Sequence, residues 1–203
     1  MKTIAGAIFL FFAMHGAAYA TPVLSFSGAI IGGTGAQTHG WRFDVNSSVT
    51  VTHLGVWDRN ADGLSESHQV GIWDSTGTLL TSATVLSGTT APLDSNGLFR
   101  LVDIPDIVLA PAARYRVGAL YILNSGDNLA RDATTLTVDP SISYGAYQFA
   151  NGSSLTFPTI SNSFITNGLW GPSFEVVPEP STLVLLGAVL LAAALRSPAA
   201  RSA

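Results

Sequence analysis

The sequence predicts an all-β fold, a single antiparallel β-sandwich of jelly-roll type, preceded by a signal peptide and followed by a transmembrane helix. Short runs rich in β-branched and aromatic residues recur about every ten residues, separated by Gly, Asn, Asp and Pro, as in sandwiches and barrels. Helical periodicity is hard to find between them. Long uncharged apolar segments stand instead at the two ends of the chain.

The N-terminal segment has the three parts of a signal peptide. Lys2 supplies the positive start, Ile4 to Met14 the apolar stretch, and Ala18 and Ala20 the small residues of a cleavage site. We therefore expect the mature chain to begin at Thr21. The alternative is an uncleaved N-terminal anchor. The short apolar stretch and the small residues of the cleavage site disfavour it.

The C-terminal segment is a second apolar run. Sixteen uncharged residues lie between Glu179 and Arg196, and a helix of that length reaches about 24 Å against roughly 30 Å of bilayer hydrocarbon. A core helix is the alternative for so short a run, but Leu183 to Leu195 is apolar on every face. Because Arg196 and Arg201 favour the cytoplasmic side, we expect a short transmembrane helix with residues 21–177 outside the membrane.

These segments divide the chain into residues 1–20, 21–177 and 178–203, with one folded domain in the middle range. That domain holds six arginines and no lysine against ten aspartates and two glutamates, a formal charge of −6. Binding of nucleic acid needs clustered basic residues, so no nucleic-acid partner is expected. The chain has no cysteine, which excludes disulfides, a thiol nucleophile and a thiolate zinc site.

Ten strands are expected in the domain, and the clearest alternation places Tyr115, Val117, Ala119 and Tyr121 on the core face. In the run from Val49 to Trp57 the apolar phase slips, which predicts a β-bulge near His53 or Leu54. Leu123 to Val138 is polar and is expected to be a long excursion. The expected strands are Val23 to Ile30, Trp41 to Val45, Val49 to Trp57, Gln69 to Trp73, Thr78 to Leu86, Leu98 to Val102, Ile107 to Leu109, Tyr115 to Ile122, Ile142 to Phe149 and Trp170 to Val176.

The densest polar cluster has the spacing of half a calcium loop. Asp58, Asn60 and Asp62 alternate before Gly63, and Glu66 follows, so several side-chain oxygens could converge on one cation. The second half of the pattern fails, because the twelfth position holds glutamine instead of the glutamate that would close the site. The alternative is a solvated turn, since Asp, Asn and Gly are the usual turn formers. Both interpretations stay open.

Trp57 and Trp73 bracket this loop at the ends of two strands expected to be neighbours. Exposed indoles beside acidic groups could stack on sugar rings, which makes these two residues candidate ligand contacts. The alternative is that both are core residues, as most tryptophans in sandwiches are.

Catalytic patterns are weak in this chain. It has no H-E-x-x-H spacing and no G-x-S-x-G elbow. Asp103 and Asp106 flank Pro105, but a glycosidase pair must face across a cleft, which proximity in sequence does not establish. We therefore expect the protein not to be an enzyme and to have no catalytic residues.

The end of the chain resembles the PEP-CTERM sorting signal of exported bacterial proteins. The resemblance rests on Pro178, Glu179 and Pro180, the short apolar helix, and the basic end that begins at Arg196. It implies recognition by an exosortase, a membrane-embedded processing enzyme, with removal of the helix and passage of the domain to the cell surface. Proteins of this kind occur in bacteria that make extracellular polysaccharide, and many are thought to join a biofilm matrix. The basic end is sparser than in the family pattern, because serine and proline follow Arg196.

The middle of the chain is similar to a β-sandwich domain of unknown function found in bacterial exported proteins. The similarity is carried by Ser67 to Val85, Phe99 to Pro105 and Arg114 to Tyr121. It implies a sandwich without an established activity, so no catalytic residues are carried over.

Together these observations predict a non-enzymatic protein of the cell surface or extracellular matrix, sorted by an exosortase and held transiently in the membrane by its C-terminal helix. Extracellular polysaccharide is an expected contact, and no cofactor is expected unless the loop binds calcium. The first alternative is a carbohydrate- or calcium-binding module that stays tethered to the membrane. The second is an extracellular hydrolase, for which the chain offers no recognisable site.

Overall fold

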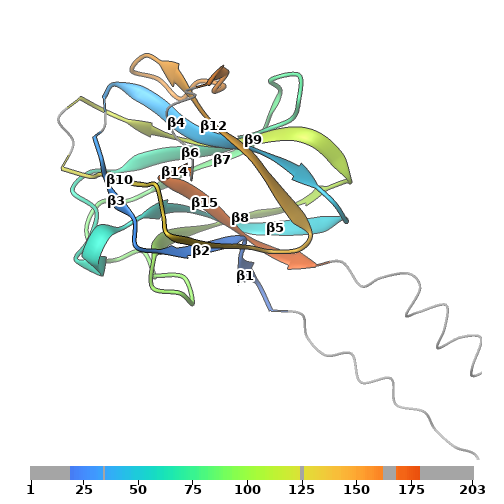
Figure 1. Cartoon of the computed structure of the whole chain (residues 1–203), viewed down its shortest axis with the longest axis horizontal. Helices are drawn as coiled ribbons and strands as arrows, with labels where there is room; N and C mark the ends of the chain where they lie inside the picture. Colours follow the sequence, from blue (N-terminus) through green and yellow to red (C-terminus); the bar gives the residue numbers. More distant parts are fainter. Residues whose placement is uncertain (1–18, 34, 124–125, 162–167, 179–203) are drawn as a thin grey trace, which may run out of the picture.

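The structure, a computed structural model, describes residues 19–33, 35–123, 126–161 and 168–178 (Figure 1). Strands dominate these residues, and the helical element among them is the short 3-10 turn η1 (Arg59–Ala61). The predicted all-β fold is thereby confirmed. The strands are β1 (Thr21–Pro22), β2 (Leu24–Ser27), β3 (Ile30–Gly32), β4 (Gln37–Val45), β5 (Val49–Trp57), β6 (His68–Trp73), β7 (Leu79–Val85), β8 (Phe99–Leu109), β9 (Ala112–Tyr121), β10 (Leu129–Arg131), β11 (Thr135–Val138), β12 (Ile142–Asn151), β13 (Ile160–Ser161), β14 (Leu169–Trp170) and β15 (Pro172–Pro178).

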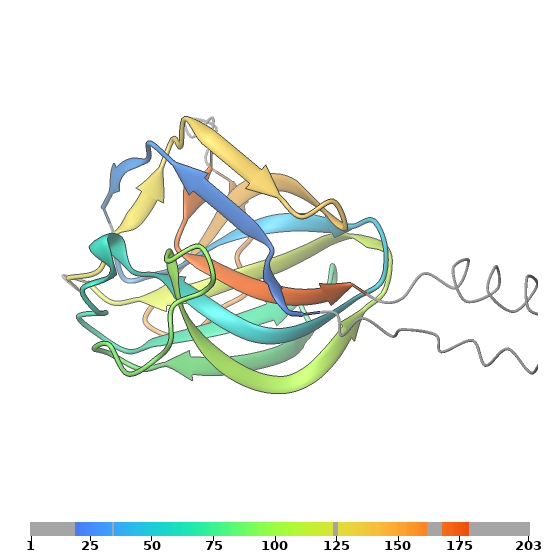
Figure 2. The ribbon, with the colours of Figure 1, turned by 90° about the horizontal axis from the view of Figure 1, so that it is seen from below.

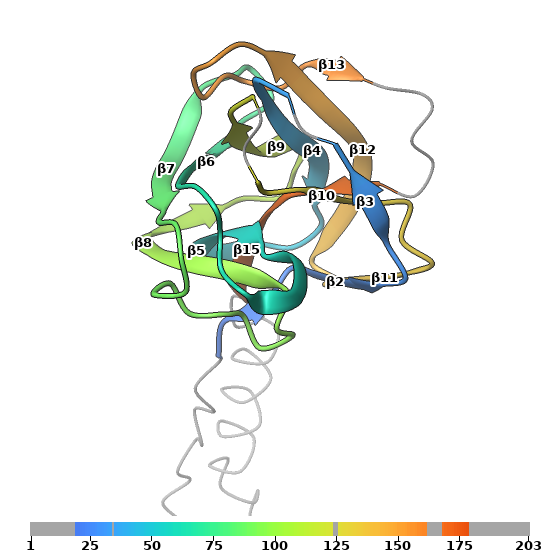
Figure 3. The same ribbon diagram turned by 90° about the vertical axis from the view of Figure 1, so that its left-hand side faces the viewer.

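Within the described ranges the strands form four sheets, and their pairings are antiparallel. The larger two have the orders β13-β12-β4-β9-β6-β7 and β1-β15-β5-β8. The smaller two are β14-β10-β3 and β11-β2. Figure 3 shows β4, β6 and β9 on one side of the domain and β5, β8 and β15 on the other.

One hydrophobic core contains residues of both larger sheets. Trp41 on β4 is fully buried and stacks against Phe174 on β15, with ring centroids 5.7 Å apart. Phe43, two residues along β4, lies 5.0 Å from the same ring. The indole Nε1 of Trp41 donates a hydrogen bond to the carbonyl oxygen of Pro172 at 2.9 Å. Aromatic contacts therefore connect the two sheets.

The alternation expected along β9 is observed. Val117, Ala119 and Tyr121 are fully buried in the core, and Tyr115 packs against it half-buried. The predicted bulge in β5 is also present, because the register between β5 and β8 shifts between Val51 and His53. The slip in apolar phase thus marks the place where the strand needs an extra residue to return its side chains to the core.

Several expectations about strands were wrong. The runs from Val23 to Ile30 and from Trp170 to Val176 are each divided between two strands of different sheets, β2 and β3 in the first and β14 and β15 in the second. The runs from Leu98 to Val102 and from Ile107 to Leu109 belong to one strand, β8, that continues through Pro105. Proline lacks an N–H but is tolerated on an edge strand, and β8 is the edge of its sheet. The polar excursion from Leu123 to Val138 contains the short strands β10 and β11, which pair with β3 and β2. Strands of three and four residues are too short to give a clear period.

The two ends of the domain meet in one sheet. Thr21 and Pro22 of β1 pair with Val176 and Glu175 of β15, whose last residue, Pro178, pairs with Val49. The chain therefore enters and leaves the domain at the same end, as Figures 1 and 2 show. The predicted helix from Leu183 to Leu195 and nearly all of the predicted signal peptide lie outside the described residues. Within the described part of the chain, no helix has the length and apolar character needed to cross a bilayer.

Candidate functional site

The candidate site lies where β5 ends. Trp57 is the last residue of that strand, and its indole packs against the ring of Phe26 with centroids 6.1 Å apart. Its backbone N–H donates to the carbonyl of Gly171 at 2.7 Å, and the N–H of Asp58 donates to the carbonyl of Leu98 at 2.9 Å. These hydrogen bonds fix the start of the loop against two other segments of the chain.

A buried ion pair holds the loop in place. The Nε of Arg100, on β8, donates to a carboxylate oxygen of Asp58 at 2.7 Å, and both side chains are buried. The other nitrogens of the same guanidinium donate to the backbone carbonyls of Thr89, Ala91 and Ala61. Such a pair is stable in the interior only because its donors and acceptors are satisfied. Arg100 thus connects the loop after β5 to the segment between β7 and β8.

The loop itself is tightly curled. Asn60 and Ala61 have φ values of 70° and 60°, and Gly63 has a φ of 109°. Asparagine and glycine tolerate this left-handed region, whereas alanine enters it at a cost. The N–H of Gly63 donates to both carboxylate oxygens of Asp58, at 3.2 and 3.0 Å. Asn60 and Asp62 are left exposed.

A small polar pocket of about 170 Å³ adjoins this loop. Asp58, Asn60 and Asp62 line it, as predicted for the calcium loop, together with Asp127 and Asn128 from the connection between β9 and β10. Glu66 is not among the lining residues. No spacing rule relates the two added residues to the loop, which is why the sequence did not identify them.

The carboxylate of Asp127 is occupied by protein donors. It accepts hydrogen bonds from the backbone N–H groups of Ser65 and Glu66, at 2.9 and 3.0 Å, and lies 2.8 Å from Nε2 of His68. Burial by itself raises the pKa of Asp127, but the hydrogen bonds from His68, Ser65 and Glu66 outweigh it and hold the pKa below the usual value. Among the described residues, no three His, Cys, Asp or Glu side chains are placed to bind one metal ion.

We expect millimolar calcium, or a chelator, to leave the melting temperature of the protein unchanged. The reason is that calcium would have to displace Arg100 from Asp58. A cation that did bind, at 100 times its Kd, would add about 2.7 kcal/mol to the free energy of unfolding and would raise the melting temperature. Thermal melts in both conditions check this, with Asp62→Asn as the control that removes an exposed carboxylate. A calcium-dependent rise in melting temperature that Asp62→Asn abolishes would establish the cation site instead.

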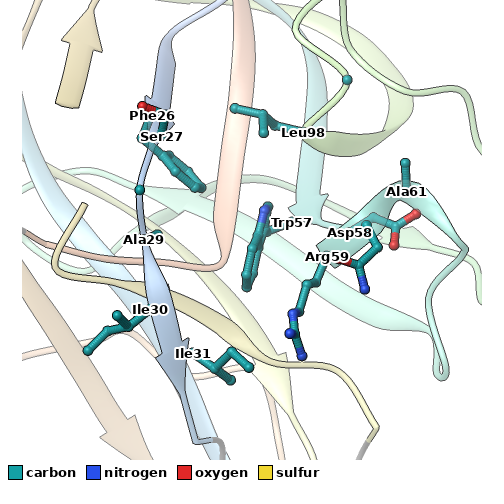
Figure 4. A pocket seen from close by; sticks show the side chains of 13 residues that line it. Phe26, Ser27, Ala29, Ile30, Ile31, Trp57, Asp58, Arg59, Ala61 and Leu98 are labelled. Atoms are coloured by element: carbon teal, nitrogen blue, oxygen red, sulfur yellow. The ribbon is translucent and has the colours of Figure 1, made fainter. Parts of the chain in front are cut away.

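A larger pocket of about 810 Å³, which we call the slot, also adjoins Trp57 and the loop that follows it. Residues 26–31 form one wall, and residues 57–61 form the other, with Gly97 and Leu98 beside them. Figure 4 shows Trp57 between Phe26 and Arg59, with Ile30 and Ile31 nearby on the first wall. Trp57 lines both pockets and keeps 9% of its surface exposed.

Trp73 lies elsewhere, so the expectation that the two tryptophans end neighbouring strands was wrong. β5 belongs to the four-stranded sheet and β6 to the six-stranded one. The indole of Trp73 lies over a row of glycines, where Cβ atoms built at Gly71 and Gly118 would come within 3.2 and 3.3 Å of it. Phe157 packs against the indole at 6.2 Å, and 4% of Trp73 is exposed. Trp73 is thus covered where it lies, whereas Trp57 borders a pocket.

The predicted processing residues flank the domain. Ala20 directly precedes β1, and Pro178 ends β15. Ala18, Glu179 and Pro180 lie outside the described residues.

Comparisons with known proteins give two family matches. The family described as "Domain of unknown function (DUF4082)" matches residues 28–167, more than half of the chain. The family described as "PEP-CTERM protein-sorting motif" matches residues 176–199. No curated protein and no solved structure matches. The first match includes the wall of the slot at residues 57–61, and the second begins inside β15.

Proposed function

We propose, on the basis that the chain belongs to the family described as "Domain of unknown function (DUF4082)", that it is a non-enzymatic protein of the cell surface or extracellular matrix. The PEP-CTERM protein-sorting motif implies an exported protein that an exosortase processes. Beyond this, we propose that the protein acts in the extracellular matrix, that it is anchored only transiently in the membrane, and that it has no enzymatic activity. A biofilm or exopolysaccharide matrix is the setting we infer.

The observation that carries the proposal is the place of the sorting motif relative to the fold. The match begins at residue 176, and β15 ends at Pro178, so the motif overlaps the domain by only three residues. Cleavage beyond Pro178 would release a domain that retains every strand of the described residues. Because β1 and β15 pair, a C-terminal anchor would hold the domain by the same end through which it was exported.

The proposed anchor is the apolar helix from Leu183 to Leu195 with Arg196 at its inner end. A span of about 24 Å in roughly 30 Å of hydrocarbon is marginal, which favours transient retention. Pro180 disfavours helical geometry at Glu179, so the segment between domain and helix would stay extended and accessible to the exosortase.

Comparing host cells with and without the exosortase tests this proposal. We expect the protein to lose its tail and leave the membrane fraction without detergent when the exosortase is present. In cells lacking the enzyme, the longer form should stay in the membrane fraction. Equal masses with the tail retained in both strains, together with a need for detergent, would support a permanent tether and overturn the proposal.

We further propose that the larger sheets make one sandwich of jelly-roll type. The connections from β4 to β5, from β5 to β6, from β7 to β8 and from β8 to β9 each pass from one larger sheet to the other, as in a Greek key. The first and last strands, β1 and β15, are neighbours. The contact between Trp41 and Phe174 supports this arrangement.

The lining of the slot supports the absence of catalysis. Acid-base hydrolysis of a glycoside needs two carboxyl groups that face each other. Among the residues that the structure describes, Asp58 is the single carboxylate that lines the slot, and Arg100 and Gly63 donate hydrogen bonds to its oxygens. Assays for glycosidase and esterase turnover are expected to show no rate above buffer, and measurable turnover would make the hydrolase alternative the better one.

A second candidate function is binding of carbohydrate, and the observation that favours it is the position of Trp57 in the slot. An indole combines a large apolar face with a polar N–H, which suits the apolar face and hydroxyl rim of a sugar. Trp73, the other predicted ligand residue, is covered by Phe157 and does not line the slot.

A further inference from the structure

The slot carries a positive charge that the domain does not neutralise. Arg59 lines it and is exposed, and within the described ranges its guanidinium has no hydrogen bond or ion pair. The neighbouring carboxylate of Asp58 is already paired with Arg100 at 2.7 Å. Arg59 also lines the small polar pocket, where Asp62 and Asp127 are the nearby carboxylates, but Asp58 is the carboxylate among the described residues that line the slot. Although the domain has a formal charge of −6, the slot therefore presents a cation to solvent.

We propose that the slot binds an anionic glycan, with a uronate carboxylate on Arg59 and the apolar face of a sugar ring against Trp57. This inference rests on the proposed surface role and deepens it by naming the class of ligand. A guanidinium binds a carboxylate through two parallel N–H···O bonds. We therefore expect Arg59 to favour a sugar that carries a carboxylate over a neutral sugar.

The walls of the slot supply the apolar part of such a site. Trp57 and Phe26, from opposite walls, have ring centroids 6.1 Å apart, and Ile30 and Ile31, on the same wall as Phe26, are 50% and 46% exposed. A volume of about 810 Å³ lies in the range of small-ligand sites. Binding would cover apolar surface that the domain otherwise leaves in water.

The backbone along residues 26–31 supplies polar groups. Among the described strands β2 pairs only with β11, and β3 pairs only with β10, so each has one edge without a strand partner, and residues 26–31 line the slot. An open edge presents unpaired N–H and C=O groups, which can bind the hydroxyls of a sugar.

An extended peptide is the competing occupant of an open strand edge. Gly28, with a φ of 66°, interrupts the edge between β2 and β3, and these strands have four and three residues. A paired peptide needs a regular ladder of hydrogen bonds, whereas hydroxyl groups do not. The interruption therefore favours the glycan.

Calorimetric titration of the protein purified from its host tests the inference. The probes are tetragalacturonate and, as a neutral tetrasaccharide, cellotetraose. We expect tetragalacturonate to bind at least about tenfold more tightly than cellotetraose, and Arg59→Gln to remove about tenfold of that affinity. Raising the salt concentration should weaken binding of the acidic probe only.

Arg114→Gln is the matched control, because Arg114 is also exposed and does not line the slot. It should leave both affinities unchanged. Trp57→Phe, which keeps a ring against Phe26, should weaken the binding of both probes.

Equal affinity for the two probes, no binding of either, or an unchanged affinity in Arg59→Gln would overturn the inference. So would tighter binding of an acidic β-strand peptide that depends on Arg59. None of these results bears on exosortase processing, so the surface role would be judged separately.

Discussion

Replacing Arg100 by methionine is expected to lower the free energy of unfolding by about 3–5 kcal/mol. Methionine keeps an unbranched side chain of similar length but removes every hydrogen bond of the guanidinium. The carboxylate of Asp58 would then be buried without its cation, and the carbonyls of Thr89, Ala91 and Ala61 would lose their donor. Denaturant unfolding of the purified variant and the parent measures the difference.

Two further variants separate the ion pair from the general loss of an arginine. Arg59→Met removes an exposed arginine of the same loop and is expected to change stability by no more than about 0.5 kcal/mol. Adding Asp58→Asn to Arg100→Met should restore part of the loss, because the unpaired carboxylate is gone. A loss below about 1 kcal/mol in Arg100→Met would show that the pair does not hold the loops together.

Replacing Trp41 by alanine is expected to have an effect of similar size, about 3–5 kcal/mol. The indole is fully buried and contacts Phe43, Tyr144, Trp170 and Phe174. Its removal would leave a cavity between β4 and β15 and would free the carbonyl of Pro172. Thermal and denaturant melts with circular dichroism measure the loss.

Val108→Ala is the control for this variant, because Val108 is an exposed residue of β8. It should stay within about 0.5 kcal/mol of the parent. If Trp41→Ala were no more destabilised than Val108→Ala, the two larger sheets would not depend on the contact between Trp41 and Phe174.

Strands with a clear period of two were predictable from the sequence. The bounds of β5, Val49–Trp57, are those expected, and the bulge lies where the apolar phase slips. The side chains of such a strand alternate between its two faces, so the burial of each residue can be predicted from the local sequence pattern. The continuation of β8 through Pro105 was not visible, because it depends on β8 being at an edge.

The candidate site was predictable only in part. Its tryptophan and polar loop were identified from local spacing, but Arg100 is 42 residues from Asp58 in the chain and was missed. A single arginine between Phe99 and Leu101 in a predicted strand was the available signal, since such a residue needs a buried partner. The slot could not be foreseen, because residues 26–31 and 57–61 meet only in the folded chain.

The protein isolated from its host offers the most direct measurement, which is mass spectrometry of its C-terminal peptide. The account predicts a terminus after Pro178, which still pairs with Val49 in the sheet, and before Leu183. A mature protein that still carried Leu183 to Leu195 would contradict it.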